Sequence, residues 1–149
     1  SIRTYAPIAP PYFDGCLFMN ATYEMSEELA NLFTKGLESL SKHLYEKNID
    51  PTKLFPVSLI FTKDGSFSVT ENEATTYGRC MSFLVYSMER IITSNNQHMQ
   101  LFAFIEELVH YYFQETNETK VKLTTFSVVQ KIFPEITFEE VTSWGVNWS

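Results

Sequence analysis

Residues 97–114 read QHMQLFAFIEELVHYYFQ, and the apolar pattern of this stretch decides the expected fold. Large apolar side chains recur every three or four positions, as Met99, Leu101, Phe102, Ile105, Leu108, Val109, Tyr112 and Phe113. This spacing predicts an amphipathic helix whose apolar stripe faces a core. Asn95 and Asn96 precede the stretch and are favourable N-cap residues. We therefore expect a central helix from about residue 97 to about residue 114.

A second long helix is expected nearer the N-terminus. Ser26 supplies a capping hydroxyl, and Glu27 and Glu28 place negative charge where the helix dipole favours it. Apolar residues then recur at helical spacing up to about residue 47, where Asp50 and Pro51 mark the end of the helix. Residues 1–25, which precede this helix, are expected to form an extended arm packed on the body of the protein through their apolar side chains.

Between the two helices the pattern favours strands. Residues 56–61 and 66–69 are short apolar runs separated by Asp64 and Gly65, a pair typical of hairpin turns. They predict two antiparallel strands. Residues 75–86 are rich in β-branched and aromatic side chains and predict a third strand.

Two further helices are expected after the central one. Residues 117–133 carry apolar side chains at helical spacing and are followed by Pro134, which cannot continue a helix. Thr137 followed by Glu140 forms a capping box that opens a last short helix. The sequence thus predicts a single α+β domain over residues 1–149, with a long N-terminal helix, a small antiparallel or mixed three-stranded sheet, a central helix and C-terminal helices.

Composition narrows the classes of partner. With 44% hydrophobic residues, the 149-residue chain has ample material for one core. Its 18 acidic and 11 basic residues give a formal net charge of −7, which repels phosphate backbones and anionic membrane surfaces. We therefore expect neither nucleic acid nor a membrane as a partner.

The cysteine count and the hydropathy favour a cytoplasmic location. Cys16 and Cys80 are too few for a disulfide framework, and we interpret them as two buried thiols, with one bridge as the alternative. No apolar stretch reaches the roughly 20 residues of a transmembrane helix, and the first residues lack the apolar region of a signal peptide.

The central helix carries the one group of residues whose spacing suggests a metal-binding or catalytic site. Residues 106–110 read EELVH, so Glu106 and His110 are four residues apart and project from the same face of the helix. A carboxylate and an imidazole at this spacing can coordinate the same metal ion. The plainer interpretation is an intrahelical pair between Glu106 and His110, which contributes at most a few tenths of a kcal/mol.

This pentapeptide resembles the His-Glu-x-x-His motif of the zincin metallopeptidases, with Glu106 in the first ligand position. The expected order of a long helix, a small sheet and then the motif helix is also similar to that of compact zincins. The resemblance implies a zincin-like fold and a zinc ion held by Glu106, His110 and a third ligand from the next helix. Glu118 is the candidate for that ligand, and Glu115 competes with it.

By the same resemblance, Glu107 would be the general base of a metal-dependent peptidase acting on a protein or peptide. An inactive relative that keeps the fold is the other form of this hypothesis. The hypothesis from a different class is a non-catalytic interaction or regulatory domain without metal. It would make contacts through the aromatic N-terminal arm or the tail that carries Trp144 and Trp148.

Other chemistry receives less support from the sequence. Glu107 and His110 also have the Glu-x-x-His spacing of di-iron bundles, but no second such motif follows. Cys80 with a histidine could form a thiol catalyst, but no family signature surrounds it. His43 and His98 are expected to lie on the surface.

Overall fold

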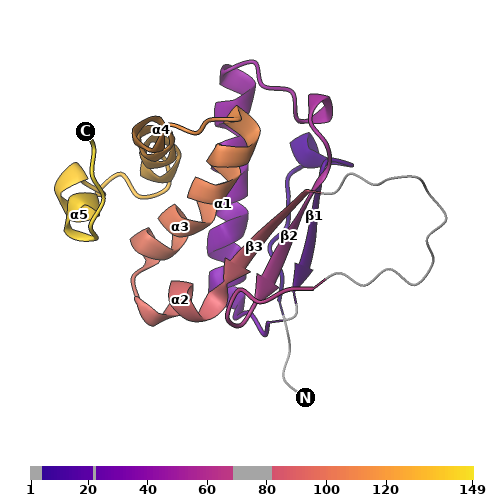
Figure 1. The fold of residues 1–149 in the computed structure, drawn as a ribbon, viewed down its shortest axis with the longest axis horizontal. Helices are drawn as coiled ribbons and strands as arrows, with labels where there is room; N and C mark the ends of the chain where they lie inside the picture. The colour runs from indigo at the N-terminus through magenta and orange to yellow at the C-terminus, as the bar shows by residue number, and fades with distance from the viewer. Residues whose placement is uncertain (1–4, 22, 69–81) are drawn as a thin grey trace.

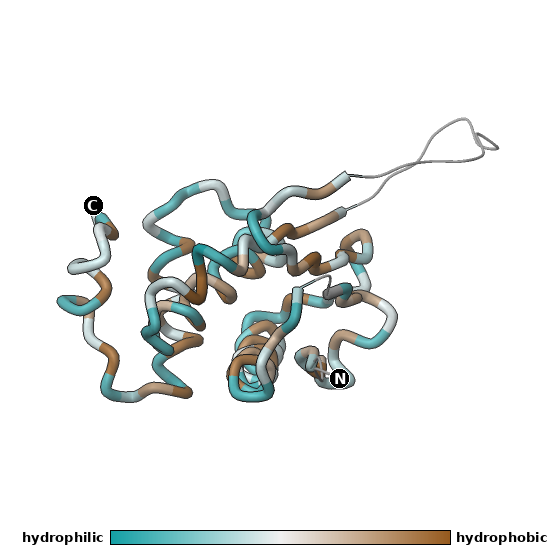
Figure 2. Tube along the Cα trace, turned by 90° about the horizontal axis from the view of Figure 1, so that it is seen from below, coloured by the Kyte–Doolittle hydropathy of each residue, from teal (hydrophilic) through white to brown (hydrophobic). Residues whose placement is uncertain are grey.

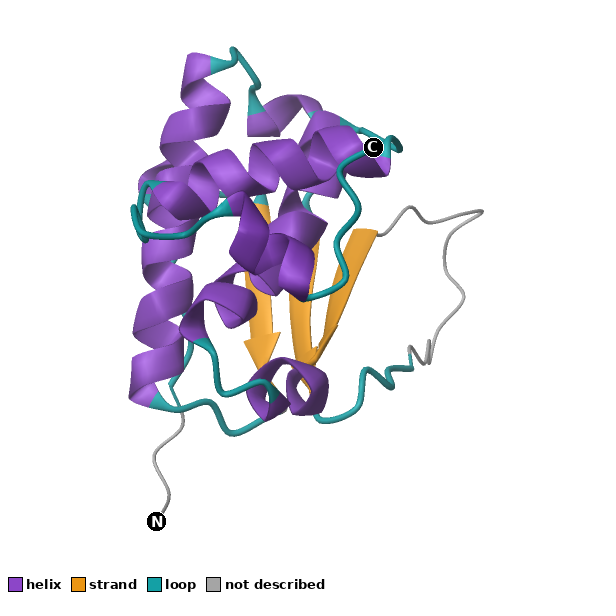
Figure 3. Ribbon diagram, turned by 90° about the vertical axis from the view of Figure 1, so that its left-hand side faces the viewer, coloured by secondary structure: helices purple, strands orange, loops and turns teal. Residues whose placement is uncertain are grey.

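The computed structural model describes residues 5–21, 23–68 and 82–149. The elements follow in the order η1 (Pro11–Phe13), β1 (Leu17–Ala21), α1 (Glu27–Glu46), η2 (Pro51–Lys53), β2 (Val57–Thr62), β3 (Ser82–Ser87), α2 (Met88–Thr93), α3 (Gln97–Phe113), α4 (Glu118–Gln130) and α5 (Phe138–Ser143). Helices α1 and α3 lie against one face of the sheet, with α4 and α5 beyond them (Figure 1). The view in Figure 3 also places the helices on one side of the three strands. The α+β class expected from the sequence fits this arrangement.

The sheet is parallel throughout, so the predicted antiparallel or mixed sheet is wrong. The strand order is β1-β2-β3, with Leu17 paired to Val57 and Val57 paired to Ser82, and both pairings are parallel. Parallel neighbours need a crossover that returns the chain to the same end of the sheet, and α1 provides it between β1 and β2. The prediction fails because it leaves β1 out: part of the expected N-terminal arm is the first strand of the sheet.

The predicted hairpin at Asp64 and Gly65 is a local turn instead. The Thr62 hydroxyl accepts a hydrogen bond from the Gly65 amide at 2.8 Å, and Gly65 has a φ of 84°. After this turn, residues 66–68 are not in a strand, and Val69 lies outside the described residues. The Lys63 carbonyl instead accepts from the Glu89 amide at 2.9 Å, at the start of α2. Asp-Gly therefore specifies the turn here but not its partner strand.

The third strand is shorter in the structure than in the prediction. Residues 82–86 of the expected strand lie in β3, whereas residues 75–81 lie outside the described part of the chain. β3 leads directly into α2, so the chain leaves the sheet at Met88.

The N-terminal segment is attached to the body by buried and hydrogen-bonded groups. Phe13 is buried, and the Tyr12 hydroxyl donates to the Ile49 carbonyl beyond the end of α1. The Tyr5 amide donates to the Met25 carbonyl at 3.3 Å. These contacts hold β1 in place as an edge strand.

The core lies between the sheet and the pair α1 and α3, and the positions predicted for both helices are confirmed. The rings of Phe33 and Phe104 stack at 4.0 Å between centroids, with Phe61 of β2 close to both. Gly36 of α1 faces α3, and a Cβ on Gly36 would lie 2.6 Å from Leu101 Cδ1, so glycine permits this close approach. In Figure 2 the colour alternates between polar and apolar along the helices, as expected of amphipathic helices packed on a core.

The C-terminal helices also form close to where the sequence predicts them. The Thr137 side chain accepts from the Glu140 amide at 3.1 Å and caps α5, as its capping box predicts. Phe138 stacks on Phe126 of α4 at 4.2 Å between centroids, and Trp148 meets both rings edge-on. The tail is thus packed on α4.

Among the residues that the structure describes, no helix combines the length and the apolar character needed to span a membrane.

Candidate functional site

The residues singled out in the sequence lie on two helices joined by a tight turn. Glu106, Glu107 and His110 are in α3, and Glu118 is the first residue of α4. Gln114 ends α3 in the left-handed region with a φ of 50°, which turns the chain off the α3 axis, and α4 then crosses α3, as Figure 1 shows by drawing α4 end-on and α3 along its length. The turn therefore carries Glu118 to the face of α3 that bears Glu106 and His110.

Three of these side chains form one cluster. One ligand atom each from Glu106, His110 and Glu118 can be chosen so that all three lie within 4.8 Å of one another. His110 Nε2 is 3.5 Å from Glu118 Oε1. In the described part of the chain this is the one group of acidic, histidine or cysteine side chains with such spacing. Glu118, and not Glu115, is the acid that joins the two residues of α3.

Glu115 contributes through its backbone instead. Its carbonyl oxygen lies 3.0 Å from His110 Nδ1. A carbonyl can only accept, so Nδ1 carries a proton in this contact, and Nε2 is the ring nitrogen that faces Glu118 in the cluster. Histidine ligands of metals are commonly oriented by such a hydrogen bond from the other ring nitrogen. The carboxylate of Glu115 lies instead 3.7 Å from the ammonium of Lys120.

Lys122 is the residue that sequence reasoning missed. Its Nζ lies 2.7 Å from Glu106 Oε1 and 3.2 Å from Glu118 Oε2, so it bridges the two acids. The side chains of Lys122 and Glu106 are only 18% and 21% exposed. Burial alone lowers the pKa of Lys122, but the hydrogen bonds and charges of the two acids outweigh it and the net pKa is raised. The i, i+4 spacing of Glu118 and Lys122 was the available signal.

The same bridge acts on Glu118. The hydrogen bond from Lys122 is the main cause that holds the pKa of Glu118 below its usual value, and His110 adds to it. Glu118 therefore stays ionised, which a ligand to a metal cation must be.

Glu107 is not one of the three clustered residues, but it is close enough for their charges to affect its pKa. It is exposed, about 100° round the helix from Glu106. Its pKa is raised, mainly by desolvation and further by Glu106 and Glu118, while His110 and Lys122 oppose the rise. The carboxyl that the motif assigns as a general base is thus less acidic than an ordinary glutamate. The cluster contains Glu106 rather than Glu107, which leaves the Glu-x-x-His alternative without a third ligand among the described residues.

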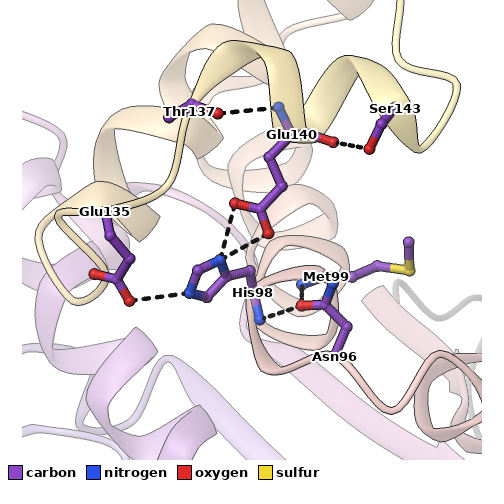
Figure 4. Close-up of polar contacts among 7 residues, drawn as sticks. All are labelled: Asn96, His98, Met99, Glu135, Thr137, Glu140 and Ser143. Atoms are coloured by element: carbon purple, nitrogen blue, oxygen red, sulfur yellow. Dashed lines mark hydrogen bonds and ion pairs between the residues drawn. The ribbon is translucent and has the colours of Figure 1, made fainter.

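The other two histidines lie elsewhere. His98, expected on the surface, has a side chain only 19% exposed, and its Nδ1 lies 2.8 Å from Glu140 and its Nε2 3.1 Å from Glu135 (Figure 4). Its ring also packs against Phe133. His98 therefore links the start of α3 to the C-terminal segment. His43 is half-buried on α1, and desolvation followed by the charge of Lys47 lowers its pKa.

Comparisons with known proteins find no match: no family model, curated protein or solved structure matches this chain.

Of the two cysteines, Cys16 is a buried free thiol and Cys80 lies outside the described residues.

The cluster offers donor atoms that zinc accepts, since imidazole nitrogen and carboxylate oxygen both ligate it. Catalytic zinc sites that include a carboxylate usually hold two imidazoles and one carboxylate, whereas this set holds one imidazole and two carboxylates. Donor atoms about 2.1 Å from a tetrahedral ion lie about 3.4 Å apart. The His110 to Glu118 distance of 3.5 Å is already close to that separation. The two acids also supply the negative charge that a dication requires, although the ammonium of Lys122 pairs with both of them.

Proposed function

We propose that this chain is a zincin-like metal-binding protein in which Glu106, His110 and Glu118 hold a divalent ion, with zinc as the first candidate. The observation that carries the proposal is the convergence of these three side chains from two helices within 4.8 Å. The orientation of His110 supports it further, because its Nδ1 is engaged by the Glu115 carbonyl and its Nε2 is left to bind.

The proposal extends to metal-dependent hydrolysis of a protein or peptide. Bound zinc would polarise a carbonyl and acidify a water molecule. Glu107 would then take the proton from that water, and because its pKa is raised, mainly by desolvation, its carboxylate is a stronger base than that of an ordinary glutamate. Glu107→Gln keeps the size of the side chain and removes the base, so hydrolysis should be lost while metal binding stays. Hydrolysis at the wild-type rate by this variant would contradict the role of Glu107.

A second candidate function is a non-catalytic interaction or regulatory domain without metal. The bridge from Lys122 favours it, because Glu106 and Glu118 are already neutralised by an internal cation. In that case the cluster serves to join α3 to α4. The aromatic tail offers this candidate less support, because Trp144 packs on Phe102 and Trp148 on Phe126.

Metal analysis of purified, untagged protein distinguishes the two candidates. The wild-type chain should carry near-stoichiometric zinc after reconstitution, measured by mass spectrometry of the elements. A Glu106→Ala, His110→Ala double variant should carry none. A Glu139→Ala variant is a control that removes an exposed acid of α5, and it should match the wild type. Absence of metal from all three proteins would favour the interaction domain.

A further inference from the structure

The ammonium group of Lys122 is hydrogen-bonded to both carboxylates of the proposed metal site. Its Nζ lies 2.7 Å from Glu106 Oε1 and 3.2 Å from Glu118 Oε2, two of the three proposed ligands. Both hydrogen bonds join charged groups, and with an exposed fraction of 18% the Lys122 side chain is largely shielded from solvent. Lys122 is therefore a partly buried ion-pair partner and not a solvent-exposed surface lysine.

A metal ion and Lys122 compete for the same negative charge. Zinc binds carboxylate oxygens at about 2.0–2.2 Å, which is inside the distance that separates Lys122 Nζ from Glu106. Two cations on one pair of carboxylates repel each other strongly in a partly shielded site. Because the side chain of lysine is a flexible four-carbon chain with a compact charge, it can leave without any movement of α4.

We infer that Lys122 is an internal cation that fills the site in the metal-free protein and withdraws when the metal binds, so that it sets the metal affinity. This inference rests on the proposed function, because it needs a metal that binds Glu106 and Glu118. What it adds is that Lys122 competes with that metal for the two carboxylates. In the metal-free protein Lys122 keeps Glu106 and Glu118 from facing each other as uncompensated charges. In the metal-bound protein the ion compensates the charges of Glu106 and Glu118 instead.

Lys122→Met tests this inference directly. Methionine keeps an unbranched chain of similar length and removes the charge. The control is Lys120→Met, which removes the same charge from the same helix. Lys120 is 72% exposed and pairs with the Glu115 carboxylate rather than with a proposed ligand. Zinc affinity is measured for the wild-type chain and both variants by competition with a chelating dye.

We expect Lys122→Met to bind zinc about tenfold more tightly than the wild type, a difference of about 1.4 kcal/mol. Lys120→Met should stay within roughly threefold of the wild type, since it alters only the long-range field. The wild-type chain provides a second readout that needs no variant to fold. In its NMR spectrum the Cε–Hε signal of Lys122 should shift in step with added zinc, while that of Lys120 should not.

Each outcome decides a different question. If the wild type binds zinc and Lys122→Met binds it no more tightly, the inference is overturned and the proposed function stands. If only Lys122→Met binds zinc, the inference is supported and the proposed function fails for the natural chain. If neither protein binds zinc and the Lys122 signal does not move, both are overturned.

Discussion

His110 Nδ1 lies 3.0 Å from the backbone carbonyl oxygen of Glu115, just past the end of α3. Glu115, which the sequence offered as the alternative third ligand to Glu118, therefore orients His110 through its backbone. Because the carbonyl belongs to the backbone, the orientation of His110 does not depend on the side chain at position 115. The roles of the two acids can therefore be separated by mutation.

Glu118→Gln should weaken zinc binding at least about tenfold, because a charged donor is replaced by a neutral one. Glu115→Gln leaves the backbone carbonyl in place and should change zinc affinity less than about threefold. Isothermal titration of both variants with zinc checks the pair. Equal losses in the two variants would show that Glu118 has no special place among the ligands.

Glu107→Gln should alter the pH dependence of stability in a defined direction. The pKa of Glu107 is raised above its ordinary value of 4.5, so between the two values the folded chain binds more protons than the unfolded chain. Stability from this group is therefore present at low pH and lost as pH rises through the folded pKa.

Glutamine stays neutral at every pH, so the Glu107→Gln variant does not lose stability as the pH rises through the folded pKa of Glu107. At about pH 7 Glu107→Gln should be as stable as the wild type or more stable, by less than about 1 kcal/mol because the group is exposed. At about pH 4 the two proteins should unfold at the same urea concentration. A variant clearly less stable than the wild type at pH 7 would identify Glu107 as a stabilising ion-pair partner instead.

His98→Ala should loosen the C-terminal segment. The ring of His98 is hydrogen-bonded to Glu140 and Glu135, and its loss should cost about 1–3 kcal/mol of unfolding free energy. Hydrogen exchange should increase first in residues 134–149, which these bonds hold against α3. His43→Ala, which removes a histidine from another part of the surface, is the control. Unchanged exchange in residues 134–149 would mean that the apolar contacts of Phe138 and Trp148 hold the segment alone.

Phe104→Ala should be among the most destabilising substitutions. Phe104 is fully buried and stacks on Phe33 between the sheet and α1, so its loss leaves a cavity and should cost about 3–5 kcal/mol. Leu123→Ala removes a side chain that is 43% exposed on α4, and it should cost less than about 1 kcal/mol. Urea unfolding of both variants measures the difference. Similar values for the two would contradict the position of Phe104 at the centre of the core.

Local signals in the sequence were sufficient for the long helices α1 and α3, but not for the short helix α2. The Ser26 cap and the apolar repeat predicted α1, and the repeat from Met99 to Phe113 predicted α3, because a helix satisfies its backbone bonds within one segment. The same regularity placed Glu106 and His110 on one face. The choice of Glu118 as their neighbour was a prediction about the next helix, and the structure brings the three together.

The pairing of the strands and the surroundings of the site were decided by the tertiary structure. Asp64 and Gly65 predicted a turn, but whether a strand pairs in parallel depends on a partner far away in the chain, here β1 and its crossover helix. Glu118 is close to Lys122 by helical spacing alone, but only the packing of α4 on α3 brings Glu106 to Lys122. In the same way, only the packing of the C-terminal segment on α3 brings Glu140 to His98. Helical periodicity is a property of one segment, whereas strand order and charge pairing between elements arise only when the segments meet.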